Sequence, residues 1–249
     1  MGRAHAGMVV LGLTAAVLLA AAPGLWAQEP LVAKLDPSGM VRVFAGDAEL
    51  AMIELNAHGP EWQHAPQASA TARFSVLPNG GSRRFVGTLP VPKTDGGAIM
   101  YTETLKLLPT GLKLEYEVGM TKAMKLDGLQ VSVLLPVAQY AAKELVISNP
   151  DADPQIATFP KEQIGNAFQV WSGEGSRIEV AKGTDQAVTL ELRAAADVVI
   201  QDLRQWKQDS FEIRFPAIME APGRDVTADD RLHFDVTVSF AGPVKLEGP

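Results

Sequence analysis

The chain has 249 residues, no cysteine and a formal net charge of −7 at pH 7. The lack of cysteine excludes disulfide bonds and thiol chemistry, and mild acidity without a Lys/Arg cluster argues against nucleic acid and anionic membrane surfaces as partners. A chain of this length can bury a sufficient core without disulfides, as one large sandwich or two small ones.

Residues 1–27 have the features of a cleavable secretory signal peptide. Arg3 gives a basic start, the run from Met8 to Ala22 is almost entirely apolar, and Ala27 places a small residue at the expected cleavage site. The apolar run of about 15 residues is shorter than the roughly 20 residues that a membrane span needs. We therefore expect an exported protein, periplasmic or secreted, with no membrane span after cleavage.

From residue 28 to residue 241, apolar and polar residues alternate in many short runs, which is typical of strands that bury one face. Clear runs occur, in chain order, at Leu112–Val118, Val131–Leu135, Ile178–Val180, Val188–Leu192, Phe211–Phe215 and Leu232–Phe240. Turns that contain glycine and proline, such as Leu108–Gly111, separate these runs. We expect roughly 13 to 16 strands.

Few helices are predicted, since only Val137–Lys143 and Lys161–Gly165 favour helical turns. A strand with one apolar face must cover that face, and here another sheet is the available cover. The sequence therefore predicts an all-β fold, a large antiparallel β-sandwich, with a barrel as the alternative. Residues 28–241 form this domain, residues 149–154 are a loop that could subdivide it, and residues 242–249 are expected to be a C-terminal tail.

The segment Val198–Trp206 carries the most suggestive cluster of side chains. If it is one strand, Asp202, Arg204 and Trp206 share a face. The indole could then stack on the C–H face of a sugar ring, and the two charged groups could bind hydroxyls. The alternative is a structural ion pair beside a partly buried tryptophan.

A second candidate is Asn56–His64, which we interpret as a loop with two histidines, a glutamate and a tryptophan. Trp62 and His64 are candidate ligand-binding residues, because binding residues concentrate in loops. The segment offers too few metal ligands, at no recognised spacing, so we expect no metal site. The alternative is that these histidines are simply solvated.

The third candidate, Trp171–Ser176, has only a faint likeness to a phosphate-binding glycine loop, because Ile178 stands where the third glycine would be. We predict a turn here, with Trp171 as a candidate stacking platform for a sugar. No pattern in the chain predicts a cofactor, and none brings two carboxylates together into a hydrolytic site.

Several segments of the C-terminal half together carry a family resemblance. They are Gly111–Val118, Asp127–Leu129 leading to Leu134–Pro136, Ile200–Trp206 and Ser210–Arg214, within Tyr101–Phe240. In order and spacing they resemble exported bacterial β-sandwich modules associated with glycoside hydrolases, of the galactose-mutarotase-like supersandwich type. The resemblance implies a sugar-related role, most often accessory binding beside a catalytic domain. Mutarotases use a histidine and a glutamate as acid and base, but neither falls on a matching motif here, so that activity is not carried over.

These observations favour an exported β-sandwich protein that binds a polysaccharide or oligosaccharide without catalysis. One alternative is a sugar-active enzyme on the same fold, either a glycoside hydrolase or an epimerase. Another is a structural or assembly protein of the envelope that binds a second protein through a sheet edge or a flat face. The candidate ligand-binding residues are Trp62, His64, Trp171, Asp202, Arg204 and Trp206.

Overall fold

The computed structural model describes residue 2, residues 29–78 and residues 80–249. Apart from Gly2, the predicted signal peptide lies outside the described residues. No helix in these ranges is long and apolar enough to span a bilayer.

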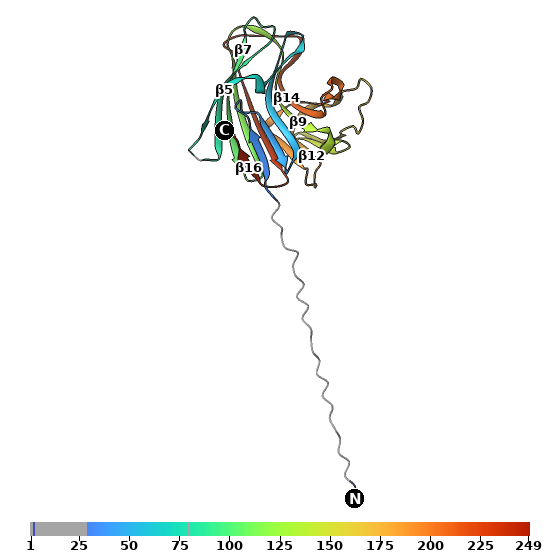
Figure 1. Ribbon diagram of the computed structural model, residues 1–249. Helices are drawn as coiled ribbons and strands as arrows, with labels where there is room; N and C mark the ends of the chain where they lie inside the picture. Colours follow the sequence, from blue (N-terminus) through green and yellow to red (C-terminus); the bar gives the residue numbers. More distant parts are fainter. Residues whose placement is uncertain (1, 3–28, 79) are drawn as a thin grey trace.

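Sixteen strands join into one large, curled sheet (Figure 1). They are β1 (Leu31–Leu35), β2 (Val41–Ala45), β3 (Ala48–Gly59), β4 (Gln63–Pro66), β5 (Thr71–Val76), β6 (Ser82–Pro90), β7 (Ala98–Leu108), β8 (Gly111–Met120), β9 (Met124–Pro136), β10 (Glu144–Asn149), β11 (Ala152–Thr158), β12 (Gln169–Val180), β13 (Val188–Asp202), β14 (Ser210–Val226), β15 (Arg231–Phe240) and β16 (Val244–Glu247). The predicted all-β, sandwich-like fold is confirmed.

Helical structure in the described part of the chain is limited to four short pieces. These are the α-helix α1 (Val137–Tyr140) and the 3-10 helices η1 (Pro60–Trp62), η2 (Gln67–Ser69) and η3 (Leu203–Trp206). Of the two predicted helical turns, the first therefore coincides with α1. The second, at Lys161–Gly165, is wrong, because this segment consists of bends and an isolated bridge between Ile164 and Ala167.

The hydrogen-bonded path through the sheet runs β16-β1-β2-β3-β9-β14-β13-β15-β8-β7-β6-β5. Strands β10, β11 and β12 form a branch that joins at β13, and β4 pairs with β3. Neighbours pair in antiparallel fashion, as in β9 with β14, whereas β1 and β16 are parallel. In Figure 1, β5 and β16 lie on one side of the domain and β12 on the other, with β9 and β14 between them.

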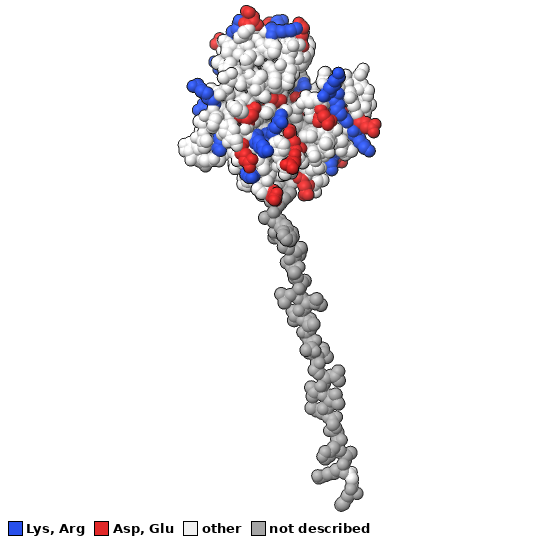
Figure 2. Space-filling model, viewed as in Figure 1, with Lys and Arg blue, Asp and Glu red and all other residues white. Residues whose placement is uncertain are grey.

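The apolar faces of the strands close on one continuous hydrophobic core. Its largest fully buried side chains include Tyr116, Tyr140, Phe85, Phe159 and Phe211, and the rings of Phe159 and Phe211 stack with centroids 4.2 Å apart. Fully burying a large apolar side chain contributes about 1.5–3 kcal/mol, which explains how a chain without disulfides holds this fold. On the face shown in Figure 2, basic and acidic side chains are intermixed rather than separated by sign.

Two expectations about the chain between and beyond the strands are corrected. Within the predicted loop at 149–154, residues 150 and 151 form the tight turn of the β10–β11 hairpin, whereas Asn149 ends β10 and pairs with Ala152, the first residue of β11. The predicted tail at 242–249 contains β16, which pairs with β1. This pairing joins the two ends of the described chain, so no local pattern could indicate it.

Four neighbouring strands, β3, β9, β14 and β13, hold a polar surface on the face opposite the core. Cross-strand pairs place Glu54 opposite Ser132, Ser132 opposite Arg214, and Glu212 opposite Gln201. Directly paired residues of a sheet point to the same side. The sheet therefore brings together polar side chains from three distant parts of the sequence.

Candidate functional site

A pocket of about 650 Å³ opens over these four strands. The polar residues of its floor are Glu54, Asn56 and His58 of β3, Gln201 of β13, and Glu212 and Arg214 of β14, and Leu134 of β9 lies among them. Its rim is aromatic and includes Trp62 of η1, His64 of β4, Phe168, and Trp206 of η3. A concave site with aromatic walls and a few convergent polar groups has the usual composition of a small-molecule site.

Strand β3 supplies half of the polar floor because of its period-two pattern. Ile53 and Leu55 point into the core and are fully buried. Glu54, Asn56 and His58 point the opposite way, yet they are only 4 %, 3 % and 9 % exposed. They are hidden from bulk water because they lie at the bottom of the pocket, beneath its rim.

Glu54 is the buried carboxyl group of the floor. Asn56 Nδ2 donates a hydrogen bond of 3.2 Å to its Oε1. Removal from water raises the pKa of Glu54 to about 7, against the opposing effect of the Asn56 hydrogen bond, and the nearby Glu212 carboxylate adds to the increase. This carboxyl group therefore changes its protonation state near neutral pH, which is the property required of an acid–base group.

Glu212, in contrast, is fully engaged with protein groups. Arg214 Nε donates a hydrogen bond of 2.6 Å to its Oε2, and Ser132 Oγ donates one of 2.6 Å to its Oε1. Both members of the ion pair are shielded, with side chains 4 % and 12 % exposed for Glu212 and Arg214. The pocket thus holds one compensated carboxylate and one carboxyl group without a basic partner.

The two histidines form a stacked pair beside Glu54. The ring centroids of His58 and His64 lie 5.2 Å apart at an interplanar angle of 26°, and those of His58 and Trp62 lie 5.5 Å apart in an edge-on arrangement. His64 Nε2 is 2.9 Å from Asn56 Oδ1. This contact requires His64 to carry a proton on Nε2, because Asn56 already uses its amide nitrogen toward Glu54.

Both imidazoles are uncharged at neutral pH. Burial lowers the pKa of His58 to about 3, with smaller contributions from His64 and Arg214. Removal from water also lowers the pKa of His64. Asn56 therefore links a neutral imidazole to a carboxyl group that titrates near pH 7, in the order Glu54–Asn56–His64.

Gln201 leaves an acceptor atom free on the other side of the floor. Its side chain is 7 % exposed, and its Oε1 is buried without a hydrogen-bond partner among the described residues. A buried polar atom without a partner costs about 1–3 kcal/mol. A ligand with a hydrogen-bond donor would recover this free energy.

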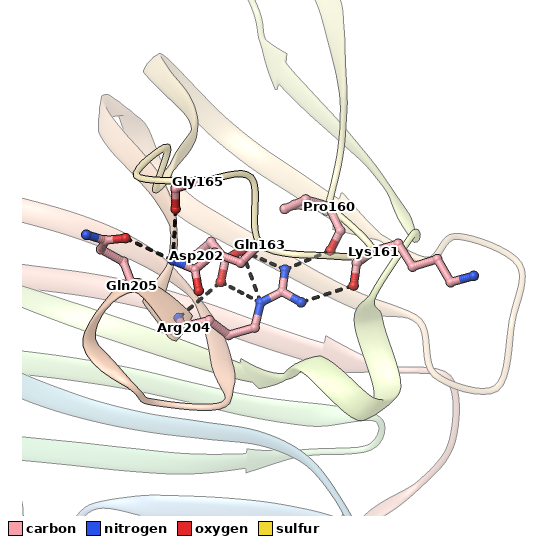
Figure 3. Close-up of polar contacts among 7 residues, drawn as sticks. All are labelled: Pro160, Lys161, Gln163, Gly165, Asp202, Arg204 and Gln205. Carbon is pink, nitrogen blue, oxygen red and sulfur yellow. Dashed lines mark hydrogen bonds and ion pairs between the residues drawn. The ribbon is translucent and has the colours of Figure 1, made fainter.

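Asp202 and Arg204 do not line the pocket, and Figure 3 shows the contacts of the Arg204 guanidinium with Asp202, Pro160 and Lys161. Arg204 Nη2 and Nε donate hydrogen bonds of 2.6 Å and 2.9 Å to the Asp202 carboxylate, whose side chain is 1 % exposed. The same guanidinium donates bonds of 3.0 Å to the backbone oxygens of Pro160 and Lys161. This clamp ties the segment that leads to Phe168 to the start of η3, which carries Trp206.

The assumption that Val198–Trp206 is one strand is wrong. Strand β13 ends at Asp202, whose Oδ1 accepts a hydrogen bond of 3.1 Å from Arg204 N and so caps η3. Lys207, in the left-handed conformation with φ 64°, ends this helix. Asp202, Arg204 and Trp206 therefore do not share one face of a strand.

The predicted turn at Trp171–Ser176 is also wrong, because this segment is part of β12. The pairing of β12 with β13 shifts register between Gly175 and Arg177, and a glycine in a strand often marks such an irregularity. Trp171 does not line the pocket, and its Nε1 donates a hydrogen bond of 2.9 Å to Gln155 Oε1.

Of the six predicted binding residues, the structure brings Trp62, His64 and Trp206 to the same pocket. The interpretation of Asn56–His64 as a loop is partly wrong, because Asn56 and His58 lie on β3. Sequence reasoning missed Glu54, Gln201, Glu212, Arg214 and Phe168 as lining residues. The four polar residues gave only the signal of a polar position in an alternating run, which normally indicates exposure to solvent, and Phe168 lies outside the strands. In the described part of the chain, no three His, Asp or Glu side chains group as metal ligands.

No protein-family model matches the chain, and no curated protein matches it. Solved structures do resemble it. A structure of a candidate aldose 1-epimerase from Escherichia coli K12 has a TM-score of 0.50 at 6 % identity, covering 86 % of this chain and 98 % of that one. The fold resembles that of galactose mutarotase-like proteins. The resemblance predicted from the sequence is thus confirmed at the level of the fold.

Two further solved structures have the same kind of name. A galactose mutarotase-like protein from Lactobacillus casei ATCC 334 has a TM-score of 0.49 at 10 % identity, covering 84 % of this chain and 99 % of that one. A galactose mutarotase related enzyme from Lactobacillus acidophilus has a TM-score of 0.46 at 8 % identity, covering 85 % and 94 %. At such identities, a likeness of this kind concerns the fold and leaves function to the site.

Proposed function

We propose that this protein binds a carbohydrate in the pocket over β3, β9, β14 and β13. The observation that carries the proposal is the aromatic rim above a polar floor in one cavity of about 650 Å³. Trp62 and Trp206 are 40 % and 54 % exposed, so their indole faces are open to a ligand. Indoles stack on the C–H faces of sugar rings, and carboxylate and amide groups bind sugar hydroxyls.

The dimensions and the fold support a small sugar. A volume of about 650 Å³ falls within the usual range for small-ligand sites. The fold is shared with a protein named as a candidate aldose 1-epimerase. A monosaccharide or a short oligosaccharide is therefore the ligand class that we propose.

Titration calorimetry of the purified mature chain with a panel of mono- and disaccharides tests the proposal. Trp206→Ala should weaken binding of any sugar that binds by about tenfold or more, since loss of a stacked aromatic ring costs about 1–3 kcal/mol. Trp171→Ala is the matched control, because this tryptophan lies outside the pocket. No binding to any sugar, or equal weakening by both substitutions, would refute the proposal.

Acid–base catalysis on the bound sugar is a second candidate function. The observation that favours it is Glu54, whose pKa is raised to about 7 and which shares the pocket with His64 and Glu212. Such a carboxyl group can both donate and accept a proton near neutral pH. The rate at which the two anomers of a sugar interconvert, followed by NMR exchange spectroscopy, should be raised by the protein, and Glu54→Gln should abolish this acceleration. Binding without any acceleration would leave the protein as a binder alone.

We also propose export, on the basis of the signal-like residues 1–27. Mass spectrometry of the native protein should give an N-terminus close to residue 28. An intact N-terminus in a cytoplasmic fraction would overturn this part of the proposal.

A further inference from the structure

We infer that the pocket selects sugars with a free amino group, and that Glu54 is the counter-ion of the ligand's ammonium. This inference rests on the proposed function and gives its ligand a chemical class. The charges that face the cavity support it, as do the hydrogen-bond acceptors on the floor that have no donor among the described residues.

The basic groups around Glu54 are already engaged or uncharged. Arg214 is paired with Glu212, and the imidazoles of His58 and His64 are neutral because burial lowers the pKa of each. Arg42, on the neighbouring strand β2, lowers the pKa of Glu54 slightly through its charge, but it is half exposed and lies 3.8 Å from Glu49. In the described part of the chain, no basic side chain forms an ion pair with Glu54.

The acidic groups near Glu54 increase its need for a cation. Glu212 shares the pocket, and Asp36 also acts on Glu54 through its charge, although its carboxylate accepts hydrogen bonds from Ser38. With Glu54 ionised, the paired Glu212 and Arg214 leave the cavity with one uncompensated negative charge. An ammonium group would bring that charge to zero without removing any protein contact.

The unpaired acceptors on the floor indicate what the ligand must donate. Asn56 supplies the one hydrogen bond to Glu54 among the described residues, and Gln201 Oε1, on a side chain more than nine-tenths buried, has no donor. Glu54 and Gln201 line the same cavity. An ammonium has three donors and no acceptor, which matches the carboxylate oxygen of Glu54 that Asn56 leaves free and Oε1 of Gln201.

Neutral and anionic sugars would satisfy this floor less well. A neutral sugar leaves Glu54 either protonated or buried as an unpaired charge, and a buried unpaired charge is costly. A uronic acid adds a third carboxylate beside Glu54 and Glu212, and the only guanidinium on the floor is already paired. The order of affinity should therefore follow the ligand charge, from positive to neutral to negative.

Binding of a cation should also release a proton. The pKa of Glu54 is about 7 without ligand, and an adjacent positive charge lowers it. At about pH 6.5, where an amine of pKa about 7.7–8.0 stays mostly protonated, Glu54 is roughly three-quarters protonated in the free protein. If the bound ammonium lowers this pKa by more than one unit, binding releases roughly half a proton or more.

The experiment is titration calorimetry of the mature protein at about pH 6.5 in two buffers of different ionisation enthalpy. The probes are glucosamine, N-acetylglucosamine, glucose and glucuronate, which share one ring and differ in charge. We expect glucosamine to bind at least about tenfold more tightly than glucose or N-acetylglucosamine, and glucuronate to bind most weakly, since each tenfold step corresponds to about 1.4 kcal/mol. Only glucosamine should release protons.

Glu54→Gln should remove both the preference for glucosamine and the proton release, whereas Glu174→Gln, an exposed carboxylate of β12, should leave both unchanged. The proton release of the wild-type protein tests the inference even if Glu54→Gln does not fold. Equal or tighter binding of glucose with no proton release would overturn the inference and leave carbohydrate binding in place. Failure of all four sugars and of the wider panel would overturn the proposed function itself.

Discussion

Replacing Arg204 by alanine would remove the guanidinium that pairs with the buried carboxylate of Asp202. The Asp202 side chain is 1 % exposed and that of Arg204 is 17 % exposed, so water can hardly replace the lost partner. Breaking a buried ion pair in this way costs about 3–5 kcal/mol. Arg204 N would still donate to Asp202 in the variant, so we expect the lower end, a loss of about 3 kcal/mol in the free energy of unfolding.

Urea denaturation followed by tryptophan fluorescence measures this loss. Arg177→Ala is the matched control, because Arg177 pairs with Glu191 on the surface, where the two side chains are 42 % and 44 % exposed. Such surface pairs contribute about 0–1 kcal/mol. The double substitution at Asp202 and Arg204 should cost clearly less than the sum of the single ones.

The clamp also predicts an effect on the pocket. Arg204 holds the backbone oxygens of Pro160 and Lys161, and this segment continues to Phe168 at the rim. Arg204→Ala should therefore weaken sugar binding even under conditions where the protein remains folded. A stability loss no larger than that of Arg177→Ala would refute the reasoning, because it would mean that Asp202 is not an uncompensated buried charge in the variant.

Two further predictions concern pH and backbone shape. Burial raises the pKa of Glu54 from 4.5 to about 7, so the folded chain holds a proton that the unfolded chain loses, and the contribution of Glu54 to stability falls by roughly 3 kcal/mol as the pH rises through this window. His58 contributes a pH dependence of stability with the opposite sign, but this contribution is common to the wild type and to Glu54→Gln. Urea unfolding of both proteins at the two ends of the window therefore isolates the effect of Glu54. Parallel pH profiles of the two proteins would contradict the prediction. Gly39 has φ 99° and faces the Glu103 carboxylate, so Gly39→Ala should lower the free energy of unfolding by about 3 kcal/mol. Gly46 has φ 58° and open space around it, so the control Gly46→Ala should lower it by about 1 kcal/mol. Equal losses in thermal unfolding would contradict the prediction for Gly39.

The sequence predicted the strands well where their signal is local. The alternation at Leu232–Phe240 corresponds to β15, and the run at Phe211–Phe215 lies within β14. A period-two pattern depends only on which face of one strand meets the core. The class of fold follows from many such runs and very few helical ones.

The pocket was harder to predict, because it depends on contacts between distant segments. Glu54 and Glu212 occupy polar positions in alternating runs, and nothing in either run indicates that a rim covers them. The prediction of Trp206 as a binding residue assumed a strand that continues to residue 206. The strand ends at Asp202, whose side chain caps η3. An aspartate at the end of an apolar run is a common helix cap, so this one local signal was available in the sequence.

The polar floor is difficult to explain as a device for stability. Burying Glu54 without a basic partner and Gln201 Oε1 without a donor each opposes folding, and an apolar side chain at either position would remove that cost. The opposite face of β3 shows this alternative, because Ile53 and Leu55 are fully buried there in the core. Buried ionisable groups with a perturbed pKa and other departures from good packing are concentrated at functional sites. On the proposal of carbohydrate binding, the floor is half of a hydrogen-bonded and charged network, whose other half would be the donor groups of the sugar.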